Sequence, residues 1–181
     1  MSPEALVAIY GPPLVGKTTL AAKLSRSLRM THINTDDIAW TLAEFYGNDH
    51  RKAVVDKVFT TSRRIAVSLV RRQLFNGVST ILDAALPDTS TWTALNQLCE
   101  LSGARMVAVE LTAPLPLLQR RLETYERRLQ AFSHTPQTLE ETYYALGTIY
   151  RDRRPSLTIL NDTSLEKSEE AVLHAILEEL Q

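Results

Sequence analysis

The chain has 181 residues, of which 44% are hydrophobic and 23% are charged, and its formal net charge at pH 7 is −1. This length and composition predict one globular domain over residues 1–181, and the near-neutral charge gives no overall basic field to recruit nucleic acid. We see no signal-peptide pattern and no apolar run near 18 residues, so we expect a cytoplasmic protein that does not bind membranes.

The first predicted strand, residues 6–10, leads into the segment Gly11–Thr19, which reads GPPLVGKTT. A strand before this pattern and a helix after it, expected over 17–28, are typical of a P-loop. Its glycines allow a tight loop whose N–H groups turn onto phosphate oxygens, Lys17 can reach the β- and γ-phosphates, and Thr18 can hold Mg²⁺. We therefore predict binding of ATP, or another nucleoside triphosphate, together with Mg²⁺. The predicted nucleotide-contacting residues of this segment are Gly11, Pro12, Pro13, Leu14, Val15, Gly16, Lys17, Thr18 and Thr19.

A short second strand is expected over 30–33, followed by a helix with Thr35 or Asp36 as its N-cap and a stop at Gly47. An acid at this place can orient an acceptor hydroxyl and take its proton. Asp36 is our candidate for that base and Asp37 is the alternative, while helix capping is the purely structural interpretation of both acids.

Aromatic residues follow the acidic pair, at Trp40, Phe45 and Tyr46. They either line a pocket for the acceptor or belong to the core. The apolar spacing after them predicts a long helix over 50–76 that ends at Gly77.

The third strand, residues 78–83, ends in Asp83. An acid at the end of a buried strand is suited to bind Mg²⁺ through water or to position the acceptor, and a turn residue is the structural alternative. A helix opened by Pro87-Asp88 and closed at Gly103 leads to a fourth strand over 106–111. Within that helix, Cys99 is expected to be a buried small hydrophobe.

An arginine-rich helical region follows, beginning at Pro114 and interrupted by a polar break at 132–137, with helix again over 139–151. We expect a helical lid over about 114–152 that places arginines over the triphosphate and excludes water. A solvated helix face is the alternative for these side chains. The candidates are Arg120, Arg121, Arg127 and Arg128, of which Arg121, Arg127 and Arg128 are the predicted catalytic ones.

A last strand over 157–160 is followed by a turn and by a helix with Ser168 as its N-cap. The dispersed histidines show no metal-like spacing, so we interpret them as structural or surface residues. They are His32, His50, His134 and His174.

Strand and helix thus alternate five times. This alternation predicts an α/β fold, a five-stranded parallel sheet with helices on both faces. Together with the P-loop, this three-layer αβα arrangement resembles the fold of P-loop nucleotide kinases. In such sheets ligands bind at the carboxyl ends of the strands, where the P-loop, Asp36 and Asp83 are expected to meet.

The order of these features resembles the small P-loop kinases that include bacteriophage polynucleotide 5′-kinase, zeta toxins and chloramphenicol phosphotransferase. The P-loop, the segment Ile33–Asp37, and Asp83 followed by Thr112-Ala113-Pro114 carry the resemblance. It implies that Asp36 is the general base and that the turn with Asn161 and Thr163 flanks the adenine.

The chain also departs from that group. Ala39 stands where polynucleotide kinase has an arginine that helps to hold its substrate, and residues 83–85 read Asp-Ala-Ala where those enzymes tend to read Asp-Thr-Asn. The acceptor site therefore differs from that of a 5′-hydroxyl nucleic-acid kinase.

We accordingly expect an ATP- and Mg²⁺-dependent kinase that phosphorylates a hydroxyl of a small-molecule or nucleotide-like acceptor. A polynucleotide or RNA-end kinase is the first alternative, and it would use a basic groove near Arg63, Arg64, Arg71 and Arg72. The others are a nucleotide-dependent switch or binding module and a degraded kinase that binds ATP structurally. Nothing in the sequence identifies the acceptor or an oligomeric state.

Overall fold

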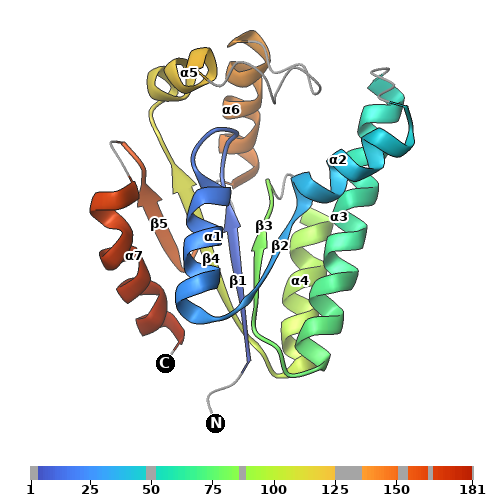
Figure 1. The fold of residues 1–181 in the computed structure, drawn as a ribbon, viewed down its shortest axis with the longest axis vertical. Coiled ribbons are helices and arrows are strands. Elements are labelled where there is room, and N and C mark those ends of the chain that lie inside the picture. Colours follow the sequence, from blue (N-terminus) through green and yellow to red (C-terminus); the bar gives the residue numbers. More distant parts are fainter. Residues whose placement is uncertain are drawn as a thin grey trace.

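A computed structural model of the chain describes residues 4–47, 52–85, 89–124, 136–150, 155–162 and 165–180. In chain order the elements are β1 (Ala5–Tyr10), α1 (Lys17–Leu28), β2 (Thr31–Asn34), α2 (Thr35–Phe45), α3 (Lys52–Phe75), β3 (Thr80–Asp83), α4 (Thr89–Ser102), β4 (Arg105–Thr112), α5 (Leu115–Thr124), α6 (Pro136–Tyr150), β5 (Leu157–Leu160) and α7 (Leu165–Leu180) (Figure 1).

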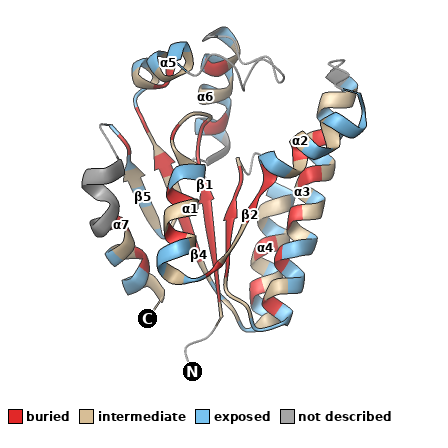
Figure 2. Cartoon of the chain, in the orientation of Figure 1, coloured by how far each residue is buried: buried red, intermediate tan, exposed pale blue. Residues whose placement is uncertain are grey.

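The strands form one parallel five-stranded sheet in the order β2-β3-β1-β4-β5. Strand β1 lies at its centre because all six of its residues are apolar or aromatic, and all six are buried (Figure 2). A continuous apolar run is what a parallel strand covered on both faces requires. The predicted fold class is confirmed.

Helices cover both faces of the sheet. Val7 and Ile9 of β1 pack into one apolar cluster with buried residues of α1 and α7. Leu6 and Ala8, which alternate with them along the strand, pack into a second cluster with α3 and α4. Side chains of a strand point alternately to its two faces, so β1 anchors both layers of the core.

Three predicted helix starts are wrong. Helix α2 is capped by Asn34 and not by Thr35 or Asp36, because the Asn34 side chain accepts a hydrogen bond from the Asp36 amide. Helix α6 begins at Pro136, three residues before the predicted start, since proline fits the first turn of a helix. Helix α7 begins at Leu165, so Ser168 is inside the helix rather than its N-cap.

The predicted helix ends agree better with the structure than the predicted starts. Gly77 has φ 72°, and its N–H donates to the carbonyl of Leu74 while Val78 N–H donates to that of Gln73. These two bonds satisfy the last carbonyls of α3, as expected for a helix that ends at a left-handed glycine. The predicted opening of α4 at Pro87-Asp88 lies outside the described residues.

Helices α2, α5 and α6 lie at the same end of the molecule as the loop between β1 and α1 (Figure 1). That end holds the carboxyl ends of the strands, where ligands bind in sheets of this kind. In the part of the chain that the structure describes, no helix is long and apolar enough to cross a membrane.

Candidate active site

The P-loop joins β1 to α1. Its backbone enters the left-handed region at Gly11 (φ 148°), Leu14 (φ 64°) and Gly16 (φ 100°). A Cβ atom on Gly11 would collide with the carbonyl oxygen of Leu111 in β4. Both the conformation and the close backbone approach therefore require glycine at this position.

Helix α1 begins without a side-chain cap. Its N-cap is Gly16, which has no side chain to satisfy the amides of the first turn, and both Thr18 and Thr19 are exposed. The first N–H groups of a helix, together with its dipole, make an anion site when no protein group occupies them. The Thr18 hydroxyl is an oxygen ligand of the kind that Mg²⁺ takes.

Lys17 folds back over the loop. Its ammonium donates to the carbonyls of Gly11 (3.1 Å) and Pro12 (2.9 Å). Burial lowers the pKa of Lys17, and the carboxylates of Asp83 and Asp36 oppose that shift by favouring the charged form. The lysine, the strand-end acid and the candidate base therefore lie within electrostatic reach of one another.

Asn34 is a site residue that we did not predict. Its Oδ1 accepts the Asp36 amide at 2.7 Å, which fixes the amide so that Nδ2 faces the Thr18 hydroxyl at 3.5 Å. The side chain is almost fully buried. One residue thus connects the candidate Mg²⁺ ligand to the helix that carries the candidate base. Asparagine's high rank as an N-cap was the available signal, but Thr35 and Asp36 are also good caps.

Asp36 lies in the first turn of α2 with an exposed side chain. It is one of two acids that act on the pKa of Lys17, and Asp37 is not among them. The backbone carbonyl of Asp37 accepts a hydrogen bond from Thr41. Of the two neighbouring acids, Asp36 is the one near the P-loop lysine.

Asp83 ends β3, as predicted, and is buried beneath the loop. The Thr35 hydroxyl donates to its backbone carbonyl at 3.2 Å, which ties the start of α2 to the end of β3. Its carboxylate Oδ2 lies 3.7 Å from Nε2 of His32. A strand-end carboxylate near Thr18 and Lys17 fits a role in holding the water shell of a nucleotide-bound Mg²⁺.

Among the residues that the structure describes, no group of three or more His, Cys, Asp or Glu side chains forms a metal cage. Mg²⁺ keeps several waters and is commonly held by one or two protein oxygens and the substrate phosphates. The sparse donor set of Thr18 and Asp83 suits that mode of binding.

Arg121 is the lid arginine that the structure brings to the loop. It projects from α5, and its Nη1 donates to the carbonyl of Leu14 at 3.1 Å. Arg120 is exposed, whereas Arg121 is half-buried. Arg127 and Arg128 lie outside the described residues, and the predicted lid over 114–152 is described only for α5 and α6.

Asn161 follows β5 and is hydrogen-bonded to the P-loop. Its Nδ2 donates to the carbonyl of Val15 at 2.7 Å, and its backbone N–H donates to Thr112 at 2.8 Å. Asn161 is 4% exposed, so its amide holds the P-loop. Thr163, the other residue predicted in this turn, lies outside the described residues.

Two aromatic residues at the end of α2 lie at the surface. Phe45 is 85% exposed and Tyr46 38% exposed, and their ring centroids lie 5.8 Å apart in an edge-to-face arrangement. Trp40 is half-buried. The core interpretation is therefore wrong for Phe45 and Tyr46.

Residues 6–146 match a family model described as an AAA domain. A search of curated proteins finds no match at the threshold used. Among solved structures, a "putative kinase" of Chloroflexus aurantiacus has a TM-score of 0.78 at 19% identity, with 100% of this chain and 98% of that chain covered.

Two further structures are similar. The APS kinase of Mycobacterium tuberculosis, in complex with AMPPNP and APS, has a TM-score of 0.67 at 16% identity and covers 98% of this chain and 99% of its own. The shikimate kinase of Acinetobacter baumannii, in complex with shikimate, has a TM-score of 0.64 at 20% identity, with 98% and 95% covered. At these identities the likeness establishes the shared fold.

Proposed function

The chain belongs to the AAA domain family, and from the chemistry of its site we propose that it is an ATP- and Mg²⁺-dependent kinase that phosphorylates a hydroxyl of a small-molecule or nucleotide-like acceptor. The observation that carries the proposal is the position of Asp36. It is an exposed acid in the first turn of α2, and it acts on the ammonium of Lys17. A kinase needs a carboxylate beside the γ-phosphate to orient the acceptor and take its proton, whereas simple nucleotide binding does not.

Each remaining part of the site has a role in this proposal. The loop amides from Gly11 to Thr19 and Lys17 bind the β- and γ-phosphates, and Thr18 holds Mg²⁺ with Asp83 beyond its waters. Arg121 leaves the Leu14 carbonyl to stabilise the transferring phosphoryl group, an ionic contact stronger than its present one. We extend the proposal to two further pairs of residues. Arg127 and Arg128 of the lid would share the role of Arg121, and the turn with Asn161 and Thr163 would flank the adenine.

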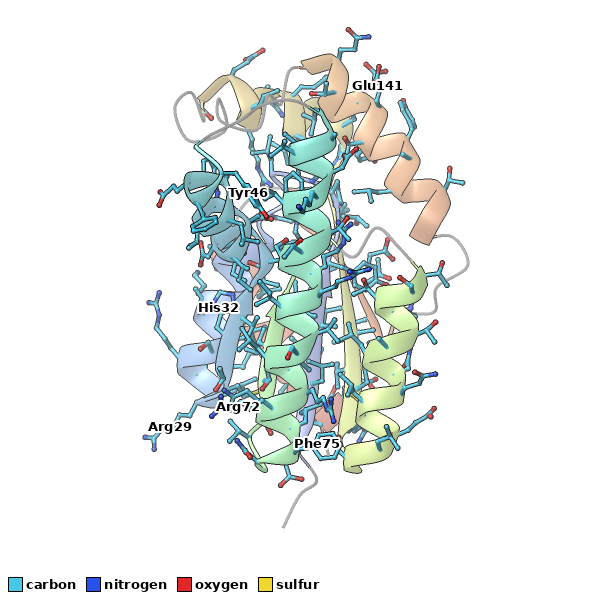
Figure 3. The ribbon with its side chains drawn as sticks, turned by 90° about the vertical axis from the view of Figure 1, so that its right-hand side faces the viewer. Arg29, His32, Tyr46, Arg72, Phe75 and Glu141 are labelled. Carbon is cyan, nitrogen blue, oxygen red and sulfur yellow. The ribbon has the colours of Figure 1, made fainter. Side chains whose placement is uncertain are left out.

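A small-molecule acceptor is supported over a nucleic-acid end by two observations. Arg71 and Arg72 are in the last turns of α3, and Arg72 lies at the end of the molecule away from Tyr46 and from Glu141 of α6 (Figure 3). These two of the four arginines of the predicted basic groove therefore lie away from the end of the molecule that holds Tyr46 and Glu141. The similar APS and shikimate kinases are named for small molecules.

The test is transfer of γ-labelled phosphate from ATP-Mg²⁺ to a panel of sugars, aminoglycosides, nucleosides, 5′-hydroxyl oligonucleotides and a metabolite extract. Label on a small molecule or nucleoside, absent with the Lys17→Met variant, supports the proposal. Label only on oligonucleotides identifies a polynucleotide kinase instead. Tight ATP binding with no labelled acceptor in any pool contradicts the proposal and favours a nucleotide-dependent switch.

A further inference from the structure

His32 lies on the same face of the sheet as Asp83. Ile33 packs into the cluster under α3 and α4, so its neighbours His32 and Asn34 face the opposite side, towards α1. Ile81 packs into the α1 cluster, and Asp83, two residues further along β3, shares its face. Strands β2 and β3 are adjacent and parallel, with His32 opposite Ile81 and Asn34 opposite Asp83. The imidazole and the carboxylate are therefore diagonal neighbours.

The two side chains are close, and both contacting atoms are buried. Nε2 of His32 lies 3.7 Å from Oδ2 of Asp83, and the side chains are 21% and 3% exposed. Within the described part of the chain neither atom has a hydrogen-bond partner. A buried polar atom without a partner destabilises the fold, so each of these atoms favours an interaction with the other.

Asp83 also interacts with a second side chain. Its charge acts on the ammonium of Lys17 in the P-loop. The carboxylate is thus subject to both Lys17 and His32, and rotation about its side-chain bonds would exchange its two oxygens. Hydrogen bonds from neighbouring residues orient the carboxylates of a metal site. Removing such a supporting contact commonly lowers the affinity for the metal about 10–100-fold.

We propose that His32 is a positioning residue for Asp83: its Nε2–H donates to Oδ2 and leaves Oδ1 turned towards the water shell of the nucleotide-bound Mg²⁺. The inference rests on the proposed nucleotide and Mg²⁺ binding of this site. The 3.7 Å separation is just outside hydrogen-bond range, so the proposed bond requires the two side chains to move closer together. His32 does not touch substrate in this arrangement and acts only through the acid.

The contact itself is tested without nucleotide or metal. Long-range ¹H–¹⁵N NMR of the imidazoles identifies which ring nitrogen carries the proton. We expect His32 to carry it on Nε2 in the wild-type protein, and we expect its ring ¹⁵N shifts to change in Asp83→Ala while those of His174 do not. A proton on Nδ1, or His32 shifts that are the same in both proteins, overturns the proposal.

The consequence for the metal is tested with a matched pair, His32→Gln and His32→Leu. The glutamine side chain places an amide N–H near the position of Nε2, whereas leucine cannot donate. We expect the Mg²⁺ concentration that gives half of the ATP-induced rise in Tm to increase about 10–100-fold in His32→Leu and to return close to wild type in His32→Gln. His174→Leu is the control, because the His174 side chain is exposed on α7.

The failure of this inference and that of the kinase proposal are distinguishable. An unchanged Mg²⁺ requirement in a folded His32→Leu variant overturns the role of His32, whatever the transfer assay gives. A raised requirement that glutamine rescues, with no phosphorylated acceptor in any pool, supports His32 and contradicts only the kinase. In EDTA, the ATP-induced rise in Tm should be the same in the wild type, His32→Gln and His32→Leu, since His32 acts on the metal site alone.

Discussion

Two helices begin at the carboxyl edge of the sheet in opposite ways. Helix α1 starts after Gly16, with no side chain to satisfy its first amides, and Lys17 and Thr18 follow directly. Helix α2 starts after Asn34, whose side chain caps it, and Asp36 and Asp37 occupy its first turn. One terminus is open and carries a cation, while the other is closed and carries acids.

This difference separates the two halves of the proposed reaction. An uncapped helix start attracts a phosphate, because its amides and its dipole still lack an anion. A capped start is already satisfied, so its first turn is rigid and can hold a side chain at a fixed place. The open terminus therefore suits nucleotide binding, and the closed one suits the aiming of a base at an acceptor. Asn34 connects the two helix starts, because its side chain contacts both the Thr18 hydroxyl and the Asp36 amide.

Removing the cation from the open terminus should give the largest effect. We expect Lys17→Met to lower phosphoryl transfer about 10³-fold and to abolish most of the ATP-induced rise in Tm, because the β- and γ-phosphates lose a charge-assisted donor. Transfer assays and thermal shifts measure both quantities. A variant with wild-type ATP stabilisation would show that the open terminus does not bind the triphosphate.

The same variant sharpens the comparison through pH. Burial lowers the pKa of Lys17 below 10.5, so between that lowered pKa and 10.5 the unfolded chain binds more protons than the folded chain. The free energy of unfolding of the wild type therefore rises with pH across this window, relative to that of Lys17→Met. Urea titrations of both proteins at a series of pH values measure the difference. A difference that stays constant or falls contradicts the assigned direction.

Arg121 of α5 contacts the loop that precedes the open terminus. We expect Arg121→Ala to lower transfer about 10²-fold, since one cation is lost from the developing charge, with a smaller effect on ATP binding. Arg120→Ala is the matched control, because Arg120 is adjacent but exposed, and it should stay within about twofold of wild type. Equal losses in the two variants would indicate a general electrostatic effect of the helix.

Removing the cap makes the closed terminus resemble the open one. We expect Asn34→Ala to lower the free energy of unfolding by about 1 kcal/mol, the usual cost of losing an N-cap. Transfer should fall about tenfold through the displaced Asp36. Asn34→Ser keeps a capping oxygen without adding a charge opposite Asp83 and should recover part of the stability. Chemical denaturation and transfer assays separate the two effects, and loss of stability without loss of transfer would limit Asn34 to capping.

A site remote from both helix starts should show the smallest effect. Cys99 is buried in the cluster under α3 and α4, as predicted from the sequence, and burial raises the pKa of its thiol to about 11. We expect almost no reaction with a thiol reagent at pH 8 until the protein is unfolded, and Cys99→Ala should keep wild-type transfer. Rapid labelling of the folded protein would contradict the assigned burial.

The sequence was most informative where backbone geometry dictates residue type. The P-loop, α1 and the stop at Gly77 are within a residue of their predicted places, because glycine adopts left-handed conformations most readily and because the apolar period is unbroken. Helix starts were less certain because neighbouring residues compete as caps. Asn34, Thr35 and Asp36 all rank well, and only the folded chain shows that Asn34 caps α2.

Contacts between strands were harder to predict than the strands themselves. His32 was interpreted as structural or surface, and its approach to Asp83 depends on the register of β2 against β3, which no local pattern encodes. The contact between Asn161 and Val15 was hard to predict for a similar reason, because it joins residues 146 positions apart in the chain. The acceptor region left the weakest signal, since aromatic residues such as Phe45 and Tyr46 fit both a pocket and the core, and both of these side chains are exposed in the structure.

The most direct test of the central claim compares Asp36→Asn with Asp37→Asn in the transfer of γ-labelled phosphate. The two acids are adjacent in one helix turn, and only Asp36 acts on Lys17. We predict a loss of about 10²–10⁴-fold in Asp36→Asn with unchanged ATP binding, and near wild-type transfer in Asp37→Asn. Equal transfer by the two variants, or a loss confined to Asp37→Asn, would contradict the assignment of Asp36 as the base.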